Sequence, residues 1–153
     1  MRIEQATTSD EIAAVRALFE EYAAWSKVDL CFQGFAAELA SLPGAYAPPK
    51  GRLFLAIATD GLAGCIALRP FKGSACEMKR LYVRPAYRGR GLGRTLAERA
   101  VADARRIGYT SIFLDTLPSM ETAIRLYESL GFERRAAYYD TPLEDTVFME
   151  LRL

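Results

Sequence analysis

The sequence predicts an α/β protein, or α+β in stricter terms, in which helices pack on a mixed central sheet. Three observations predict this class. Two segments of helical periodicity come first, short apolar runs separated by turn dipeptides follow, and a strand–helix–strand unit lies in the middle of the chain. With 153 residues, 51% of them hydrophobic, we expect residues 1–153 to form one domain with a full core.

The N-terminal segment is expected to hold one strand and two helices. Arg2–Ala6 is read as the first strand. Thr8 and Glu11 have capping-box spacing, and apolar residues then recur at helical intervals, which predicts a helix over Ser9–Ser26. Glycine and proline bracket a shorter helix at Phe35–Leu42.

Three strands are expected next. Leu53–Thr59 and Leu62–Arg69 are joined by an Asp-Gly turn and form a hairpin, and Ala75–Val83 follows a second turn. The alternation in Ala75–Val83 predicts which residues share a face. One face is expected to carry Glu77, Lys79, Leu81 and Val83, and the other Met78 and Arg80.

The C-terminal half predicts two helices and three strands. Gly91–Ile107 is a helix with an apolar stripe of Leu92, Leu96, Ala100 and Ala104. Ser119 is positioned to cap a second helix that runs to Leu130. The strands are expected at Ser111–Leu114, Phe132–Tyr139 and Thr146–Leu153.

Composition excludes several classes of function. The 20 basic and 19 acidic residues give a net charge of +1, so we expect neither nucleic acid nor a membrane as a partner. The absence of histidine excludes Ser-His hydrolysis and His-ligated zinc. The three cysteines lack metal-ligand spacing, which predicts a reduced, cytoplasmic protein without a metal.

A glycine-rich turn between a strand and a helix is the most informative segment. Arg88–Thr95 reads Arg-Gly-Arg-Gly-Leu-Gly-Arg-Thr, and its three glycines let the backbone approach a ligand. The helix that follows adds its positive end, which favours an anion. Six basic residues and no acidic one lie between Met78 and Ala97, so we expect a pyrophosphate. These residues are Lys79, Arg80, Arg84, Arg88, Arg90 and Arg94.

Two common phosphate motifs do not match this turn. The P-loop requires wider glycine spacing and a lysine where Arg94 stands, and the dinucleotide fingerprint requires glycine where Leu96 stands. The alternative to an anion site is a glycine-rich turn with a solvated basic face.

The chain resembles the GNAT superfamily of N-acetyltransferases. Arg88-x-x-Gly91-x-Gly93 matches its first signature, and the segment from Ala123 to Phe132 is similar to its second. The order of elements matches over the whole chain. The resemblance implies a mostly antiparallel sheet that splays between the strands Ala75–Val83 and Ser111–Leu114, with the pantetheine of acetyl-coenzyme A in the gap.

The resemblance also implies which residues hold the acyl donor. The backbone of the strand is expected to bind the pantetheine, and the turn is expected to bind the pyrophosphate. The implied donor-binding residues are Leu81, Tyr82, Val83, Arg88, Gly89, Arg90, Gly91, Leu92, Gly93, Arg94 and Thr95. Many relatives have asparagine where this chain has Met120, so contacts near that position must differ.

Tyr127 and Glu77 are the implied catalytic residues. Tyr127 occupies the second-signature tyrosine and is a candidate general acid for the departing thiolate; the alternative is a tyrosine packed in the core. Glu77 is a candidate base, directly or through water; the alternative is an ion pair with Lys79 or an arginine. The N–H of Val83 is implied as the oxyanion donor.

We therefore expect transfer of an acetyl or short acyl group from coenzyme A to a primary amine through a tetrahedral intermediate. The alternative is a non-catalytic acyl-coenzyme A sensor. The acceptor is a small molecule or a peptide, and homodimers are frequent in the family. Side chains that either border the acceptor or only pack are Tyr22, Trp25, Phe32, Gln33, Tyr138, Tyr139 and Asp140.

Overall fold

The computed structural model describes residues 1–153, except for the Phe32 side chain. The strands are β1 (Arg2–Gln5), β2 (Arg52–Ala58), β3 (Gly61–Pro70), β4 (Ala75–Val83), β5 (Ser111–Thr116), β6 (Glu133–Arg135) and β7 (Val147–Arg152). The helices are α1 (Ser9–Ser26), α2 (Phe35–Ser41), α3 (Leu92–Ile107) and α4 (Glu121–Ser129), and the 3-10 helices are η1 (Cys31–Gln33), η2 (Gly44–Tyr46) and η3 (Pro85–Tyr87). None of the described helices combines the length and the hydropathy that crossing a bilayer requires.

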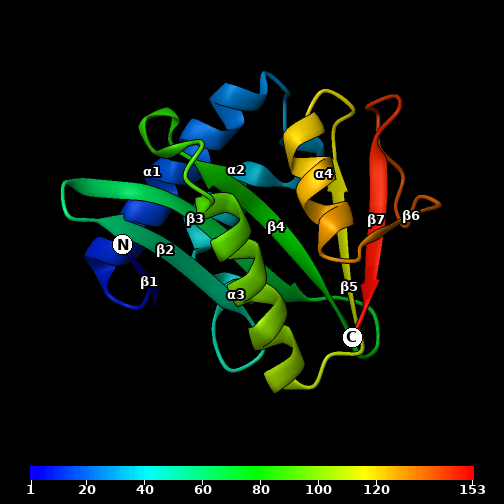
Figure 1. Cartoon of the computed structure of the whole chain (residues 1–153), viewed down its shortest axis with the longest axis horizontal. Coiled ribbons are helices and arrows are strands. Elements are labelled where there is room, and N and C mark those ends of the chain that lie inside the picture. Colours follow the sequence, from blue (N-terminus) through cyan, green and yellow to red (C-terminus); the bar gives the residue numbers. More distant parts are fainter.

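The sheet confirms the expected fold class. Its strand order is β1-β2-β3-β4-β5-β7-β6, and every neighbouring pair is antiparallel except β4 and β5, which are parallel. β4 and β5 pair only from Ala75 to Glu77, opposite Ser111–Phe113. Beyond Glu77 the two strands diverge, as Figure 1 shows, so the expected splay is confirmed.

Arg80 interrupts the alternation of β4. Its φ is 61°, in the left-handed region that a non-glycine residue rarely adopts. The register with β3 slips by one residue here, so that Arg80 and Leu81 together oppose Ile66. This is a β-bulge, which inverts the faces of all later residues in the strand.

The expectation that Glu77 shares a face with Leu81 and Val83 is therefore wrong. Leu81 and Val83 pack against the core beneath α3, whereas Glu77 lies on the opposite face of the sheet. Arg80 lies on that opposite face too, together with Lys79, instead of on the face of Met78. The extra residue of the bulge is the cause.

The sheet is covered on both faces (Figure 1). α3 and α4 lie in front of it in this view, and the expected stripe of α3 is buried in the core on this side. Its members Leu92, Leu96, Ala100 and Ala104 are at most 6% exposed. α1 covers the other face and buries Val15, Leu18 and Phe19 in a second core. The gap between β4 and β5 thus lies between two helical layers.

Two expectations for the C-terminal third are wrong. α4 begins at Glu121 with Met120 as its N-cap, and Ser119 does not cap it. β6 ends at Arg135 instead of continuing to Tyr139. The chain leaves the sheet there, because the hydroxyls of Tyr138 and Tyr139 instead bind carboxylates on β4 and β5.

The capping box at the start of α1 is confirmed and gives a stability prediction. The Glu11 N–H donates to Thr8 Oγ1 at 3.2 Å, and Glu11 Oε1 accepts from the Thr8 N–H at 2.9 Å. Thr8→Ala should lower the free energy of unfolding by about 1 kcal/mol, because an N-terminal amide loses its acceptor. Urea denaturation measures this change. Thr59→Ala, in an exposed turn, should cost less than about 0.5 kcal/mol, and equal losses would contradict the role of Thr8.

Candidate functional site

The turn between β4 and α3 has the geometry of an anion site. Gly89 and Gly91 have φ angles of 78° and 77°, which only glycine adopts without strain. Gly91 is the N-cap of α3, so the first N–H groups of that helix lack intrahelical acceptors. Together with the positive end of the helix, these groups favour a negatively charged ligand.

Gly93 has a different reason to be glycine. Its φ is not in the left-handed region, and a Cβ there would approach only Leu126 Cδ2, at 3.7 Å, and Val83 Cγ2, at 3.9 Å. These are ordinary van der Waals distances, so neither the backbone nor the packing of the protein requires glycine. The missing side chain instead leaves the backbone of the first turn of α3 open to a ligand.

The basic field around the turn is smaller than the sequence suggests. Lys79 and Arg80 lie on the other face of the sheet because of the bulge, and carboxylates pair with them there. Arg84 forms an ion pair with Glu21, with 2.6 Å between Nη2 and Oε2. The expectation of six basic groups around one anion is therefore wrong for these three. The exposed arginines that remain at the turn are Arg88, Arg90 and Arg94.

The free edge of β4 directs a backbone amide into the gap. The Arg84 N–H donates to the Ala63 carbonyl at 2.8 Å, on the β3 side. Since successive N–H groups of a strand point to opposite edges, the Val83 N–H points toward the gap between β4 and β5. The Val83 carbonyl shares this edge and accepts from Arg88 Nε at 2.8 Å. The guanidinium of Arg88 also lies 4.8 Å from the centre of the Trp25 ring.

One cavity of about 480 Å³ joins the turn, the gap and the face covered by α1. Seven of the eleven expected donor-binding residues line it: Leu81, Tyr82, Val83, Arg88, Gly89, Leu92 and Gly93. The other four are exposed beside it: Arg90, Gly91, Arg94 and Thr95. The structure thus brings the strand edge and the glycine turn together at one opening.

Tyr127 lines this cavity from α4. Its residue is 7% exposed, and its ring packs against Phe132 with 5.8 Å between ring centres. Burial raises the pKa of the phenol above its ordinary value, so the hydroxyl stays protonated at neutral pH. No described residue forms a hydrogen bond with that hydroxyl, which leaves it available to a ligand.

Glu77 is buried and fully engaged, and it is not among the residues that line the cavity. Its Oε1 accepts from Arg69, at 2.9 Å from Nε and 2.8 Å from Nη2. Its Oε2 accepts from the Tyr138 hydroxyl at 2.6 Å. The structure thus contains the ion pair with an arginine that the sequence left as the alternative reading.

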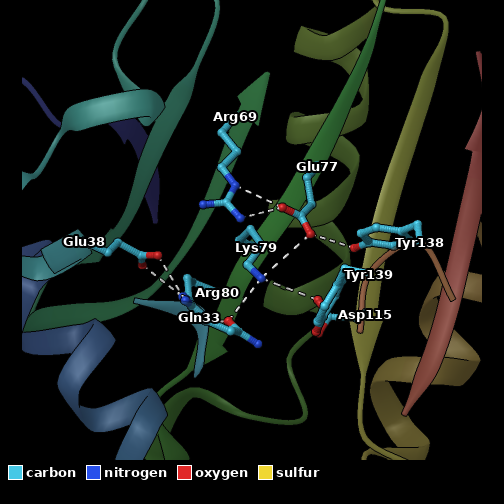
Figure 2. A network of polar contacts seen from close by, with 9 residues as sticks. All are labelled: Gln33, Glu38, Arg69, Glu77, Lys79, Arg80, Asp115, Tyr138 and Tyr139. Carbon is cyan, nitrogen blue, oxygen red and sulfur yellow. Dashed lines mark hydrogen bonds and ion pairs between the residues drawn. The ribbon is translucent and has the colours of Figure 1, made fainter. Parts of the chain in front are cut away.

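The carboxylate that does line the cavity is Asp115, which the sequence analysis missed. It is the one acidic side chain among the described lining residues. Figure 2 shows it opposite Lys79, across the point where β4 and β5 part. Lys79 Nζ lies 3.5 Å from Asp115 Oδ1 and donates to Gln33 Oε1 at 3.2 Å. Burial lowers the pKa of Lys79, and Asp115 counters this effect.

Aromatic and polar residues border the side of the cavity away from the turn. Tyr22 and Gln33 line it there, whereas Trp25 lines the cavity beneath Arg88, close to the turn. That these side chains border an acceptor stays a prediction. The Phe32 side chain lies outside the described part of the structure. Tyr138 and Tyr139 do not line the cavity; their rings meet edge to face, with 5.4 Å between ring centres, and their hydroxyls hold Glu77 and Asp115 in place.

The chain is similar to known proteins. The profile of the acetyltransferase (GNAT) family matches residues 12–132 of the chain. A Schizosaccharomyces pombe protein described as an uncharacterised N-acetyltransferase is 42% identical over 138 residues, which cover 89% of this chain and 85% of that protein.

Solved structures agree in fold. An acetyltransferase from Streptococcus agalactiae superposes with a TM-score of 0.81 at 24% identity, covering 99% of this chain and 98% of the other. A Bacillus subtilis acetyltransferase in complex with CoA has a TM-score of 0.68 at 23% identity, with coverage of 99% and 98%. At these identities the likeness concerns the fold alone.

Gly93 provides a test of the turn that does not depend on catalysis. Gly93→Ala should weaken CoA binding by about 10-fold, because a methyl group would occupy the space left for the ligand. The free energy of unfolding should stay constant or rise by up to about 1 kcal/mol, since alanine is favoured over glycine in a helix. Calorimetric titration and urea denaturation measure the two effects.

The matched control is Arg105→Ala, exposed in the last turn of the same helix, at the end away from the glycine turn. It should leave the affinity for CoA unchanged. Equal affinity of the Gly93→Ala variant and the wild type would show that the ligand does not approach this backbone.

Proposed function

Since the chain belongs to the acetyltransferase (GNAT) family, we propose that it transfers an acetyl group from acetyl-coenzyme A to a primary amine. The whole chain acts as one domain in this proposal. The observation that carries it is a single cavity into which the glycine turn, the free edge of β4 and Tyr127 all open. The acceptor is a small-molecule or peptide amine that reaches the cavity from the α1 side.

The residues present fit a coenzyme A donor. The turn offers backbone N–H groups and the exposed arginines for the diphosphate, and Gly93 leaves room for its approach. The pantetheine then follows the edge of β4 at Leu81 and Val83, which has no strand partner beyond Glu77 among the described residues. A short acyl group on the thioester would reach the part of the gap between Val83 and Tyr127.

Transfer requires that a C–N bond forms and the C–S bond breaks. The neutral amine attacks the thioester carbonyl, and the Val83 N–H, which points into the gap, donates to the oxyanion of the tetrahedral intermediate. The amine loses a proton, and the thiolate leaves. Tyr127 donates a hydrogen bond to that thiolate. Because a thiol has a pKa of about 8.5 and a phenol about 10, full proton transfer from Tyr127 is unfavourable, and the thiolate takes its proton from water.

The amine is deprotonated by a carboxylate or through water. Both carboxylate oxygens of Glu77, the expected base, accept hydrogen bonds from other side chains. Glu77 can therefore take the proton of the amine only through the groups bound to it. Asp115 lines the cavity and is closer to the acceptor in this proposal. Water that enters from the α1 side completes the path of the proton to solvent.

The alternative is an acyl-coenzyme A sensor without turnover, and one experiment separates the two. Calorimetry with CoA and acetyl-coenzyme A tests the donor site, and release of free thiol across an amine panel tests transfer. If the protein binds neither CoA nor acetyl-coenzyme A, the proposal is refuted. Tight binding without amine-dependent release anywhere in the panel would favour the sensor.

Tyr127→Phe tests the role of the phenol. The variant should lower kcat by about 10- to 100-fold, because the thiolate loses its hydrogen-bond donor. The Kd for CoA should change by less than about twofold, since the ring and its packing remain. Steady-state kinetics and calorimetry measure both.

Tyr109→Phe is the matched control, because Tyr109 is a buried tyrosine outside the cavity whose hydroxyl binds the Lys50 carbonyl. It should keep the full kcat. A Tyr127→Phe variant with an unchanged rate would remove this tyrosine from the mechanism.

A further inference from the structure

Between the sheet and α2 lies a network of three basic and three acidic side chains (Figure 2), of which Glu77, Lys79 and Arg80 are buried. Two of the ion pairs are tight. Arg80 binds Glu38 through two hydrogen bonds of 3.0 Å, and Arg69 binds Glu77 at 2.8 and 2.9 Å. These four groups are satisfied by each other and by their neighbours, so they have little capacity left for a ligand.

Lys79 Nζ also lies 3.8 Å from Glu77 Oε2. The remaining pair, Lys79 and Asp115, is loose. Their closest approach is 3.5 Å, beyond the usual range of an N–H···O hydrogen bond. An ammonium has three donors, and Lys79 uses one of them at ordinary length, toward Gln33. Asp115 Oδ2 accepts from Tyr139 at 2.6 Å, while Oδ1 has only the long contact with Lys79 among the described residues.

Both members of the loose pair line the cavity, on the side away from the glycine turn. Lys79 is held by β4 and Asp115 by β5, at the point where the strands separate. Lys79 therefore offers unused hydrogen-bond donors, and Asp115 an unused acceptor, to the same part of the cavity. A ligand with one ammonium and one carboxylate a few ångströms apart complements this pair.

From this arrangement we infer that the acceptor is an amino acid, whose ammonium is bound by Asp115 and whose carboxylate is bound by Lys79. The inference rests on the proposed acetyl transfer and names its substrate class. Binding inserts the zwitterion into the loose pair and replaces one long contact with two charge-assisted hydrogen bonds. The attacking nitrogen is then held in the gap that Val83 borders.

The charge balance of the network favours an amino acid over a simple amine as acceptor. The three basic groups of the network are matched by three carboxylates, so a lone ammonium beside Lys79 adds a positive charge that no further carboxylate of the network compensates. A zwitterion brings its own compensating charge. An amide or ester of the same amino acid lacks the negative carboxylate, so it should bind no better than a simple amine.

The first test compares acceptors on the wild-type protein. The twenty proteinogenic L-amino acids are screened with acetyl-coenzyme A, and the best of them is compared with its carboxamide and its decarboxylated amine. We expect kcat/KM to be at least about 10-fold higher for the acid, the effect of one hydrogen bond between charged groups. Equal rates for the three, or acetylation of amines but of no amino acid, would overturn the inference while leaving acetyl transfer intact.

The second test varies the protein. Lys79→Gln should lower kcat/KM for the amino acid by about 10- to 100-fold, yet change it less than about threefold for the decarboxylated amine. A purely structural lysine would reduce both alike, and that result would overturn the assignment. Lys50→Gln, an exposed lysine outside the cavity, is the control and should change neither.

Calorimetry with CoA distinguishes failure of the amino-acid inference from failure of the proposed acetyl transfer. Wild type and Lys79→Gln should bind CoA equally, because Lys79 lies on the side of the cavity away from the glycine turn. A wild-type protein that does not bind CoA would refute the proposed function itself. Intact CoA binding without acetylation of any amino acid would refute only the amino-acid acceptor.

Discussion

The separation of β4 from β5 is the constraint on which the site depends. Parallel pairing holds for three residues and then stops, and the bulge at Arg80 turns the strand out of register just beyond that point. The unpaired edge exposes backbone groups that a continuous sheet would have satisfied. In the proposed function, a ligand that lies along this edge supplies those hydrogen bonds, and the broken pairing is its binding surface.

The same bulge divides the charges of the strand between two compartments. With strict alternation, Arg80 would face α3; the inserted residue sends it, beside Lys79, to the side of α1 and α2. The glycine turn keeps only its exposed arginines, while the other face carries a network of ion pairs around the buried Glu77, Lys79 and Arg80. One backbone irregularity thus separates the proposed surface for the diphosphate from the proposed binding site of the amino acid.

Much of the fold could be predicted because its signals are local. Helical periodicity placed α1 and α3, the capping-box spacing placed the start of α1, and the glycines of Arg88–Thr95 marked the turn. The bulge could not be predicted, since a lone arginine in the left-handed region has no local signature. As a result, the sequence analysis placed Glu77 on the same face as Leu81 and Val83. The end of β6 was missed for a similar reason: the hydrogen bonds that Tyr138 and Tyr139 form with distant carboxylates have no local signature.

The site residues divide in the same way. The turn was visible in the sequence, whereas the meeting of Lys79 and Asp115 depends on the register of strands 36 residues apart in the chain. A weak signal for Asp115 did exist, because it is an acidic residue near the end of a strand expected to border the splay. Nothing in the sequence indicated that Glu77 would be held by both Arg69 and Tyr138.

The contact between Arg88 and Trp25 gives the molecule a built-in optical reporter. Trp25 is the only tryptophan of the chain, and it is 43% exposed on the wall of the cavity, beneath a guanidinium. Fluorescence excited selectively in indole therefore arises from a single ring. A ligand that draws Arg88 away changes the polarity and quenching around that ring, so occupancy of the cavity can be followed in real time on unlabelled protein.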